Sequence, residues 1–387
     1  MTRILVSAGD ASGELHAAAF VEALRARLPD ARVCGLGGVE LEKAGVELLV
    51  HQRELAIGGL VEVLGSAPRV LRAWRRMGRA LASRPDLVVL VDSPDFNLPL
   101  ARRAKRRGVP VLYYVSPQVW AWRRGRVRKI AKRVDRLAVI FPFEPAFYAG
   151  TGLRVEFVGH PLVERMRGFA ASCDRAQARA GLGLDPGALV VVCLPGSRRN
   201  ELRFGLGLQL ECARQIAARE PRARFVVALP ASIARDGVDA AIRGLALPEA
   251  VRVDVVQGRT YEAVRAADVA LAKPGTVTVE VALLGCPLVV AVRAHPLSAA
   301  IGRRVLRVPS FTMVNLVAGA PVVPEFLQEQ ARPERIAEAV LALAAGPARE
   351  LQLLQLAKVR ERLGSGGAAE RAAAIAAEMV GRARARA

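Results

Sequence analysis

Residues 87–97 read Leu-Val-Val-Leu-Val-Asp-Ser-Pro-Asp-Phe-Asn, a short apolar run followed by polar and turn-forming residues. A continuous apolar run is typical of a strand that is buried on both faces, as the strands of parallel sheets are. An amphipathic pattern typical of a helix follows at residues 98–107. The stretch therefore predicts a strand, a turn and a helix of a parallel α/β sheet.

The same alternation continues in both directions along the chain. Further apolar runs of the first half lie at residues 3–7, 32–36, 110–115, 137–141 and 155–158. The alternation stops near Pro161, passes a polar stretch at residues 169–187 and then restarts. The apolar runs of the second half lie at residues 189–194, 224–229, 251–256, 268–272 and 287–292.

Two successive strand–helix series predict an α/β protein with two Rossmann-like, doubly wound parallel-sheet domains that face a cleft. Helical patterns fill the chain from Arg332 onward. We predict a first domain at residues 1–168, a second at residues 169–365 and a C-terminal helix at residues 366–387. This helix is expected to pack back on the first domain or to exchange with a partner chain, so a homodimer is an open alternative.

The 387 residues have a globular and strongly basic composition. Lys and Arg number 57 against 36 Asp and Glu, a net charge of +21 that attracts anionic membranes, phosphorylated substrates or nucleic acids. Solvated, arginine-rich helix faces are the ordinary alternative. Apolar runs fall short of the roughly 20 residues of a membrane span, and the first residues lack a signal-peptide pattern, so a cytoplasmic protein is expected.

Cysteine and histidine spacing argues against a metal site. The five cysteines are widely spaced without a Cys-x-x-Cys pair, and the four histidines have no metal-ligand spacing. Reduced thiols in a cytosolic protein, and no structural zinc, are therefore expected.

The end of the apolar run at residues 87–91 carries candidate catalytic groups, because ligands of parallel sheets bind beyond the carboxyl ends of the strands. Asp92 ends this run, and Asp95 and Asn97 follow. Desolvation at a buried strand end raises the pKa of a carboxyl group, which suits a general base. Capping of a helix that begins near Leu98 is the ordinary alternative for Asp95 or Asn97, whereas Asp92 lies at the strand end itself.

Two turns of the second half each lead from an apolar run into a helix. The first contains Ser197 and Arg198, which together with backbone N–H groups form an anion cradle. The second contains Gly275 and Thr276, whose amides suit a phosphate, and Glu280, which can accept hydrogen bonds from ribose hydroxyls. Neither turn has the ending of a P-loop, and together they predict a site for a nucleotide diphosphate.

Two segments of the first half carry candidate contacts to an acceptor or a membrane. The turn at residues 7–14 places Ser12 among small residues that let a ligand approach the backbone, unless Ser12 only caps the next helix. Residues 115–133 place tryptophans before a basic helix, which suits a phosphorylated amphiphile or a membrane surface. The candidates of this segment are Trp120, Trp122, Arg123 and Arg126. Core tryptophans beside a solvated helix are the ordinary alternative.

These segments, read in order, resemble the lipid-A-disaccharide synthase family over nearly the whole chain. The similar strings lie at residues 54–64, 92–98, 114–122, 141–144, 157–161, 194–198, 275–280, 315–319 and 324–328. Two of them are characteristic of the family: Asp-Ser-Pro-Asp-Phe-Asn at residues 92–97 and Ser-Pro-Gln-Val-Trp-Ala-Trp at residues 116–122.

The resemblance implies an inverting, metal-independent glycosyltransferase of the GT-B type, without a cofactor, that is peripheral on the inner face of the inner membrane. Its substrates would be UDP-2,3-diacylglucosamine and 2,3-diacylglucosamine 1-phosphate, called lipid X. Its products would be lipid A disaccharide 1-phosphate and UDP, in lipopolysaccharide biosynthesis. Anionic lipid of the inner membrane would be a further partner.

The resemblance also implies roles for particular residues. Asp92 would take the proton from the acceptor 6-hydroxyl, and Asn315 would join Ser197, Arg198 and Thr276 in stabilising the departing UDP. One departure affects this site, because the usual Ala-Ser-Gly-Thr of the family is Lys273-Pro274-Gly275-Thr276 here. The departure removes a hydroxyl and an amide donor from the second turn, and the charge of Lys273 is expected to compensate.

Two other functions stay open at this point. The first is another GT-B enzyme acting on a UDP-sugar, such as an epimerase or a peptidoglycan-type transferase; an epimerase would convert the donor without an acceptor. The second is a non-catalytic basic protein that binds nucleic acid or membrane, which would bind DNA or RNA with a steep salt dependence. Recognised nucleic-acid-binding motifs do not accompany the basic segments, so we expect no nucleic-acid partner.

Overall fold

The computed structural model describes residues 1–55, 62–120, 125–294 and 309–385, without the side chains of residues 11, 62–67, 199, 200 and 203. The chain forms two compact units, Met1–Pro161 with Gly366–Ala387, and Leu162–Ser365. The boundary between the two units therefore follows Pro161, whereas the sequence predicts the end of the first domain at residue 168. The reason is that helix α7 (Leu162–Ser172) packs against helix α12 (Thr276–Leu283) of the second unit.

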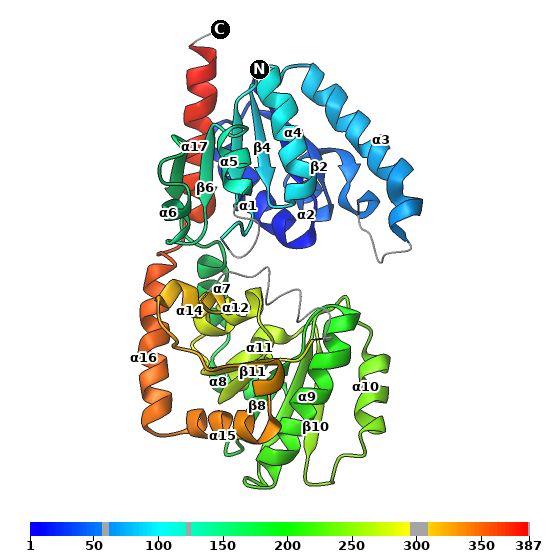
Figure 1. Ribbon diagram of the computed structural model, residues 1–387, viewed down its shortest axis with the longest axis vertical. Coiled ribbons are helices and arrows are strands. Elements are labelled where there is room, and N and C mark those ends of the chain that lie inside the picture. Colours follow the sequence, from blue (N-terminus) through cyan, green and yellow to red (C-terminus); the bar gives the residue numbers. More distant parts are fainter. Residues whose placement is uncertain (56–61, 121–124, 295–308, 386–387) are drawn as a thin grey trace. The chain divides into compact units, whose positions relative to one another are not determined.

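The described part of the first unit contains a seven-stranded parallel sheet in the order β3-β2-β1-β4-β5-β6-β7 (Figure 1). Its strands are β1 (Arg3–Ala8), β2 (Arg32–Gly37), β3 (Glu47–His51), β4 (Leu87–Val91), β5 (Val111–Tyr114), β6 (Arg136–Val139) and β7 (Arg154–Phe157). Its helices are α1 (Ala11–Arg27), α2 (Val39–Lys43), η1 (Gln52–Glu54), α3 (Glu62–Ala82), α4 (Pro94–Arg106), α5 (Arg126–Ala131), α6 (Glu144–Phe147) and α17 (Ala368–Arg384).

Strand β4 lies in the middle of this sheet, paired with β1 and β5. All five of its residues are buried, which confirms the strand predicted from the apolar run. The predicted start of the next helix at Leu98 is wrong, since α4 begins at Pro94. The fixed φ of proline suits the first turn of a helix, where its missing N–H has no helical partner.

Helix α17 returns to the first unit and packs along α1. Its buried face is formed largely by small residues, including Ala372 and Ala376, which allow close approach of the two helices. On its other side Glu378 forms an ion pair with Arg136 of β6. In the single chain the helix packs on the first unit. The choice between this packing and exchange with a partner chain stays a prediction.

The described part of the second unit contains a six-stranded parallel sheet in the order β10-β9-β8-β11-β12-β13. Its strands are β8 (Val190–Leu194), β9 (Arg224–Leu229), β10 (Arg252–Gln257), β11 (Val269–Ala272), β12 (Leu288–Val292) and β13 (Glu325–Leu327). Besides α7 and α12, its helices are α8 (Arg175–Gly181), α9 (Arg199–Ala217), α10 (Arg235–Gly244), α11 (Thr260–Ala266), α14 (Met313–Ala318), η2 (Gln328–Gln330), α15 (Pro333–Ala344) and α16 (Pro347–Arg362).

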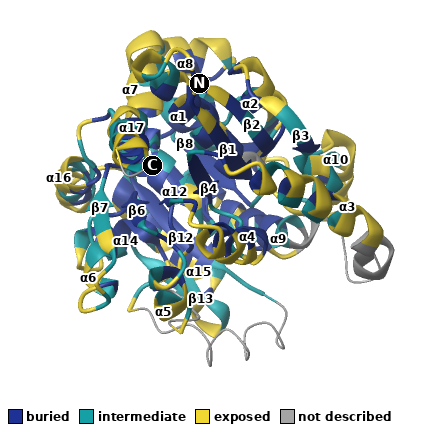
Figure 2. Cartoon of the chain, turned by 90° about the horizontal axis from the view of Figure 1, so that it is seen from above, coloured by how far each residue is buried: buried dark blue, intermediate teal, exposed yellow. Residues whose placement is uncertain are grey.

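Burial follows the same pattern in both units. Figure 2 shows buried residues along the strands and exposed residues on the outer faces of the helices. The fold class predicted for each half, a parallel sheet covered by helices, is confirmed. The short edge strands β3 and β13 were not predicted, because neither is a continuous apolar run and their residues are mostly half-buried.

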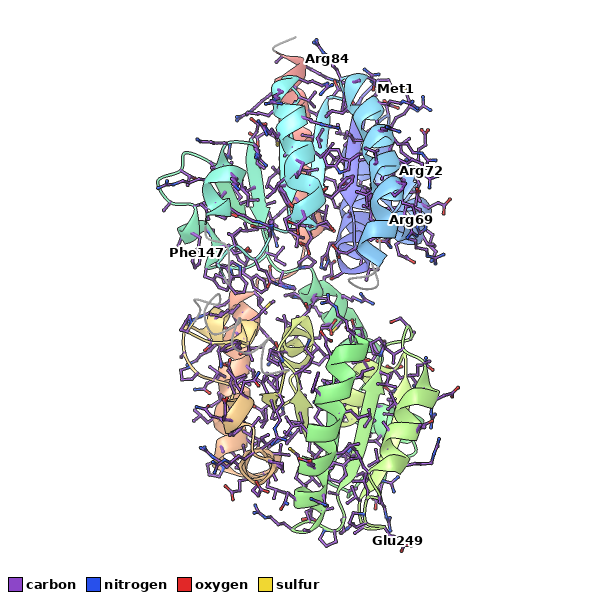
Figure 3. The ribbon with its side chains drawn as sticks, turned by 45° about the vertical axis from the view of Figure 1, so that its right-hand side comes forward. Met1, Arg69, Arg72, Arg84, Phe147 and Glu249 are labelled. Atoms are coloured by element: carbon purple, nitrogen blue, oxygen red, sulfur yellow. The ribbon has the colours of Figure 1, made fainter. Side chains whose placement is uncertain are left out.

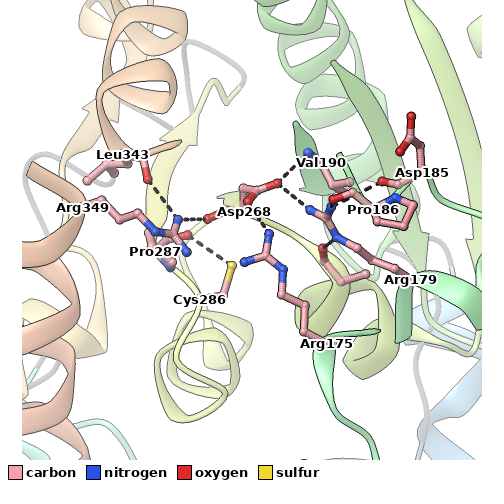
Figure 4. A network of polar contacts seen from close by, with 11 residues as sticks. Arg175, Arg179, Asp185, Pro186, Val190, Asp268, Cys286, Pro287, Leu343 and Arg349 are labelled. Carbon is pink, nitrogen blue, oxygen red and sulfur yellow. Dashed lines mark hydrogen bonds and ion pairs between the residues drawn. The ribbon is translucent and has the colours of Figure 1, made fainter. Parts of the chain in front are cut away.

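A polar network joins the helices of the second unit to its sheet. Asp268 precedes β11, and its carboxylate forms ion pairs with Arg175 and Arg179 (Figure 4). The same carboxylate accepts the backbone N–H of Val190 at 2.9 Å, and its backbone carbonyl accepts from Arg349 at 2.7 Å. Asp268 therefore fastens α8, β8 and α16 to the amino end of β11.

Candidate functional site

The turn after β4 has a strained backbone. Asp92 and Ser93 have positive φ angles of 44° and 42°, which residues other than glycine rarely adopt. The side-chain amide of Asn97 holds this turn by donating to the carbonyl oxygens of Val91 at 3.0 Å and of Asp92 at 2.8 Å. Strain of this kind persists only where the surrounding structure enforces it, and it is concentrated at functional sites.

Asn97 lies within α4, faces the core and does not cap the helix. It is fully buried, and its side-chain oxygen accepts the hydroxyl of Ser7 of β1 at 2.6 Å. The neighbouring strand β5 is followed by another residue with a positive φ, Val115, at 59°. Its carbonyl accepts the backbone N–H of Asp92 at 3.3 Å, so the strained ends of β4 and β5 are joined.

The carboxyl group of Asp92 has an unusual electrostatic environment. Burial, with the neighbouring Asp10 carboxylate as a second cause, raises the pKa of Asp92 from 3.8 to about 6, while a hydrogen bond from the Ser93 backbone opposes the shift. Among the described groups that act on this pKa none is a cation. A carboxyl group in this range is suited to accept a proton near neutral pH.

Asp10 is fixed beside Asp92 by two hydrogen bonds. As the N-cap of α1 it accepts the backbone N–H of Gly13 at 2.7 Å. Its second carboxylate oxygen accepts the hydroxyl of Ser93 at 2.7 Å. Asp10 therefore caps the N-terminus of α1 and places a negative charge next to Asp92. Its effect on Asp92 could not be predicted from the sequence, where the two residues are far apart.

The predicted acceptor or membrane residues lie in different surroundings. Ser12 is exposed on the first turn of α1. Trp120 is 4% exposed and packs edge-on against Phe143, so its predicted surface role is contradicted by its place in the core. Arg126 forms an ion pair with Asp95. Trp122 and Arg123 lie outside the described residues.

Two buried titratable groups near β6 were not predicted as site residues. Burial raises the pKa of Glu144 to about 8, although its carboxyl oxygen accepts the backbone N–H groups of Phe141 at 2.9 Å and Ile140 at 3.1 Å. Burial and the nearby His16 lower the pKa of His160 to about 3. Near neutral pH Glu144 is therefore mostly protonated and His160 is neutral, so both act as uncharged core groups. The strings Phe-Pro-Phe-Glu and Gly-His-Pro were the signal that could have identified them.

In the second unit, the two predicted anion turns are neighbours. Strands β8 and β11 pair with Leu194 opposite Ala272, and the backbone N–H of Lys273 donates to the carbonyl of Leu194 at 3.2 Å. The turn after β8 carries Ser197 and Arg198, which are both exposed. The structure thus brings together two turns that lie 78 residues apart in the sequence, from Ser197 to Gly275.

The second turn opens helix α12. Gly275 has a φ of 152°, and apart from its chain neighbours no heavy atom of the described residues lies within 4 Å of a Cβ built on it, which leaves room for a ligand at its backbone. Thr276 is exposed at the first position of the helix. Backbone N–H groups of such a first turn lack helical partners and suit an anion.

Glu280 lies one turn further along α12. Its carboxylate accepts the hydroxyl of Tyr261 at 3.0 Å, and the Arg165 guanidinium lies 5.5 Å from the centre of the Tyr261 ring. Burial raises the pKa of Glu280, while Tyr261 and Arg165 oppose this shift. Glu280 is half-buried and has acceptor capacity left for a ligand hydroxyl.

Asn315 is buried, and its side-chain amide is engaged within the protein. Its amide donates to the Val323 carbonyl and to the Glu325 carboxylate, both at 2.9 Å, and its oxygen accepts the Val323 N–H at 2.8 Å. The two donor hydrogens that the predicted contact with UDP requires are therefore engaged. In this structure Asn315 instead fixes Glu325, which also accepts the Thr312 N–H at the start of α14.

Exposed basic side chains line the outer faces of both α3 and α4. On α3 these include Arg69 and Arg72, which project from the helix (Figure 3), and Arg75 and Arg79.

The described residues contain no group of three or more His, Cys, Asp or Glu side chains that could hold a metal ion. Within the same residues no helix is both long and apolar enough to cross a bilayer.

The chain shares its fold with solved carbohydrate-active enzymes. It has a TM-score of 0.66 with the glycotransferase of kitacinnamycin, at 19% identity, covering 97% of this chain and 98% of the other. With the UDP-GlcNAc 2-epimerase of Neisseria meningitidis, solved bound to UDP-GlcNAc, the TM-score is 0.65 at 12% identity, covering 98% and 100% of the two chains. At these identities the likeness shows the fold alone, and it confirms the predicted GT-B class.

Comparison with related sequences shows which family of that fold the chain belongs to. A sequence model of the lipid-A-disaccharide synthetase family matches residues 4–379. The lipid-A-disaccharide synthase of Myxococcus xanthus is 45% identical over 381 residues, 98% of this chain and 97% of that protein. That of Syntrophotalea carbinolica is 44% identical over 380 residues, 97% of this chain and 95% of that protein. The chain therefore belongs to the lipid-A-disaccharide synthetase family, a family of glycosyltransferases.

Proposed function

We propose that the protein transfers the sugar of UDP-2,3-diacylglucosamine to the 6-hydroxyl of 2,3-diacylglucosamine 1-phosphate, lipid X. The products are the β-1,6-linked lipid A disaccharide 1-phosphate and UDP. Membership of the family supports the reaction. The observation that carries the mechanism is the strained turn at Asp92, with its raised pKa and no cation among the described groups that act on this pKa.

Asp92 is the general base of this proposal. It accepts the proton of the acceptor 6-hydroxyl while that oxygen attacks the anomeric carbon of the donor in line. The bond between this carbon and the UDP oxygen breaks, and the configuration at the carbon inverts. With a pKa of about 6, Asp92 is mostly ionised at neutral pH and still basic enough to take the proton in the transition state.

The departing UDP gains negative charge in the transition state, so groups that bind it there accelerate the reaction. We assign this role to Ser197 and Arg198 of the first turn and to Gly275 and Thr276 of the second. Glu280 accepts hydrogen bonds from the ribose hydroxyls. The proximity of the two turns and the open space at Gly275 support these assignments.

We further propose that the reaction takes place at the inner face of the inner membrane, since both proposed substrates carry acyl chains. The arginines on the outer face of α3 would attract anionic lipid, at about 1 kcal/mol for each side chain near the surface. Ser12 and Arg126 remain our candidates for the acceptor side. A homodimer with exchanged C-terminal helices remains a prediction.

Mass spectrometry of the products tests the reaction. The protein is incubated with UDP-2,3-diacylglucosamine and lipid X, without added divalent metal, and in parallel with the donor alone. Disaccharide 1-phosphate and UDP that form only when both substrates are present would support the proposal. Conversion of the donor without the acceptor would instead indicate an epimerase or hydrolase, and no conversion with donors of several acyl lengths would refute the proposed substrates.

A further inference from the structure

A carboxylate of the protein itself contacts both of the turns that we assign to the phosphates of UDP. Glu201, in the first turn of α9, accepts the backbone N–H of Ser197 at 3.0 Å through one oxygen. Its other oxygen lies 2.7 Å from the ammonium nitrogen of Lys273. Burial alone would raise the pKa of Glu201, but hydrogen bonds from Lys273 and Ser197, together with the positive charges of Lys273 and Arg198, lower the pKa overall. The carboxylate is therefore ionised and bridges the two turns.

The backbone around Glu201 is shaped to leave room for this carboxylate. Gly196 has a φ of 127°, and a Cβ on it would lie 2.6 Å from an oxygen of Glu201 and 3.0 Å from Cδ of Lys273. Gly205, further along α9, approaches the turn so closely that a Cβ on it would lie 2.7 Å from the Pro195 carbonyl oxygen. A glycine at each position allows α9 to lie against the turn with Glu201 over it.

The partners of Glu201 are the kinds of group that bind phosphate. A backbone N–H at the start of a helix and a lysine ammonium are common donors to phosphate oxygens. A carboxylate shares with a phosphate its negative charge and its paired acceptor oxygens. Lys273, which opens the second turn, takes part in this contact through its ammonium group.

We propose that Glu201 is a positioning residue that takes the place of a donor phosphate until the nucleotide binds. When the diphosphate enters, its oxygens take over the Ser197 N–H and the Lys273 ammonium, and the Glu201 side chain moves aside. The exchange keeps both turns ordered without ligand, lowers the affinity for the diphosphate and favours release of UDP after transfer. This inference rests on the proposed function, because the phosphates are those of a UDP-sugar.

Titration calorimetry with UDP, inorganic pyrophosphate and uridine tests the exchange. In Glu201→Gln one competing negative charge is lost and Lys273 is freed, so we expect UDP and pyrophosphate to bind about 3- to 10-fold more tightly. Uridine, which has no phosphate, should bind as it does to the wild type. Lys273→Met should weaken UDP and pyrophosphate but not uridine.

Glu211→Gln is the matched control. Glu211 lies on the same helix, about 15 Å along its axis from Glu201, and is paired with Arg293 at 3.6 Å. Removing its charge should leave the affinities for all three ligands unchanged. A merely structural role of Glu201 would lower thermal stability and weaken the binding of all three ligands together.

Tighter binding of UDP and pyrophosphate to Glu201→Gln, with unchanged uridine, supports the exchange. Weaker or unchanged pyrophosphate binding in a folded Glu201→Gln protein overturns it. If that variant does not fold, an unchanged pyrophosphate affinity in Lys273→Met overturns it equally. Wild-type protein that binds neither UDP nor pyrophosphate also overturns it. A protein that shows the expected pyrophosphate changes but makes no disaccharide refutes the proposed function and leaves the exchange intact.

Discussion

Asp268 and Asp92 are both aspartates at an end of a buried parallel strand, yet their surroundings are opposite. Asp268 stands before β11, and its charge is matched by Arg175 and Arg179. Asp92 stands after β4, has the carboxylate of Asp10 as its charged neighbour, and has its pKa raised to about 6. At the amino end of β11 the Asp268 carboxylate thus stabilises the fold through ion pairs. At the carboxyl end of β4 the negative charge of Asp92 is not compensated by a cation among the described groups.

This difference agrees with the direction of the strands. Ligands of doubly wound sheets bind at the carboxyl ends of the strands, where helices begin and their N–H groups are unpaired. A carboxylate at that edge whose oxygens were all engaged by arginines could not accept a hydrogen bond or a proton from a substrate. The same exchange of aspartate for asparagine should therefore have opposite consequences at the two positions.

The largest effect is expected in the rate of transfer. Replacing Asp92 by Asn removes the proton acceptor while keeping the size of the side chain, so the rate should fall by about 10²- to 10⁴-fold. The matched control is Asp86→Asn at the amino end of the same strand, where the carboxylate accepts the backbone N–H of Arg3 at 2.7 Å. Product formation under saturating substrates measures both; equal losses in the two variants would contradict the role of Asp92.

The largest loss of stability is expected at Asp268. Asp268→Asn leaves the Arg179 guanidinium, which is only 7% exposed, without its charge partner. Removing one member of a buried ion pair costs about 3–5 kcal/mol of unfolding free energy. Urea denaturation followed by circular dichroism measures the change. A loss below about 1 kcal/mol, the range of exposed ion pairs, would show that the network contributes little.

The same substitution at Asp92 should stabilise the protein. Since the folded state raises the pKa of Asp92 from 3.8 to about 6, ionisation costs stability as the pH rises through this window. This loss of unfolding free energy is complete above about pH 6, and it is absent below pH 3.8, the pKa of the carboxyl group in the unfolded chain. Asp92→Asn should therefore raise the unfolding free energy by about 1–3 kcal/mol at pH 8 and much less at pH 4. Equal destabilisation at both pH values would contradict the raised pKa.

The smallest effect is expected at Asp10. Asparagine is also a good N-cap, so Asp10→Asn should keep α1 while removing the negative charge beside Asp92. The pKa of Asp92 should then fall, and the acid limb of kcat/KM should shift to lower pH by roughly half a unit to one unit. Kinetic titration in both proteins measures the shift; a limb that stays in place would remove Asp10 as a cause.

Much of this comparison could be predicted from the sequence, but not all of it. The continuous apolar runs predicted most of the parallel strands, because strands buried on both faces need no polar positions. Asp92 could be singled out because it directly follows such a run. Asp10 beside Asp92 and Glu201 beside Lys273 could not be paired, because these contacts arise from strand order and helix packing. The buried roles of Trp120 and Asn315 likewise depend on tertiary contacts that a motif does not contain.

The most direct test of Asp92 as the general base is the pH dependence of kcat/KM in the wild type and in Asp92→Asn. We predict that the wild-type value rises about tenfold per pH unit at low pH and becomes level near pH 6, as its base loses a proton. The residual activity of Asp92→Asn should lack this limb. A limb near pH 6 that persists in Asp92→Asn, or a variant as active as the wild type, would contradict the assignment.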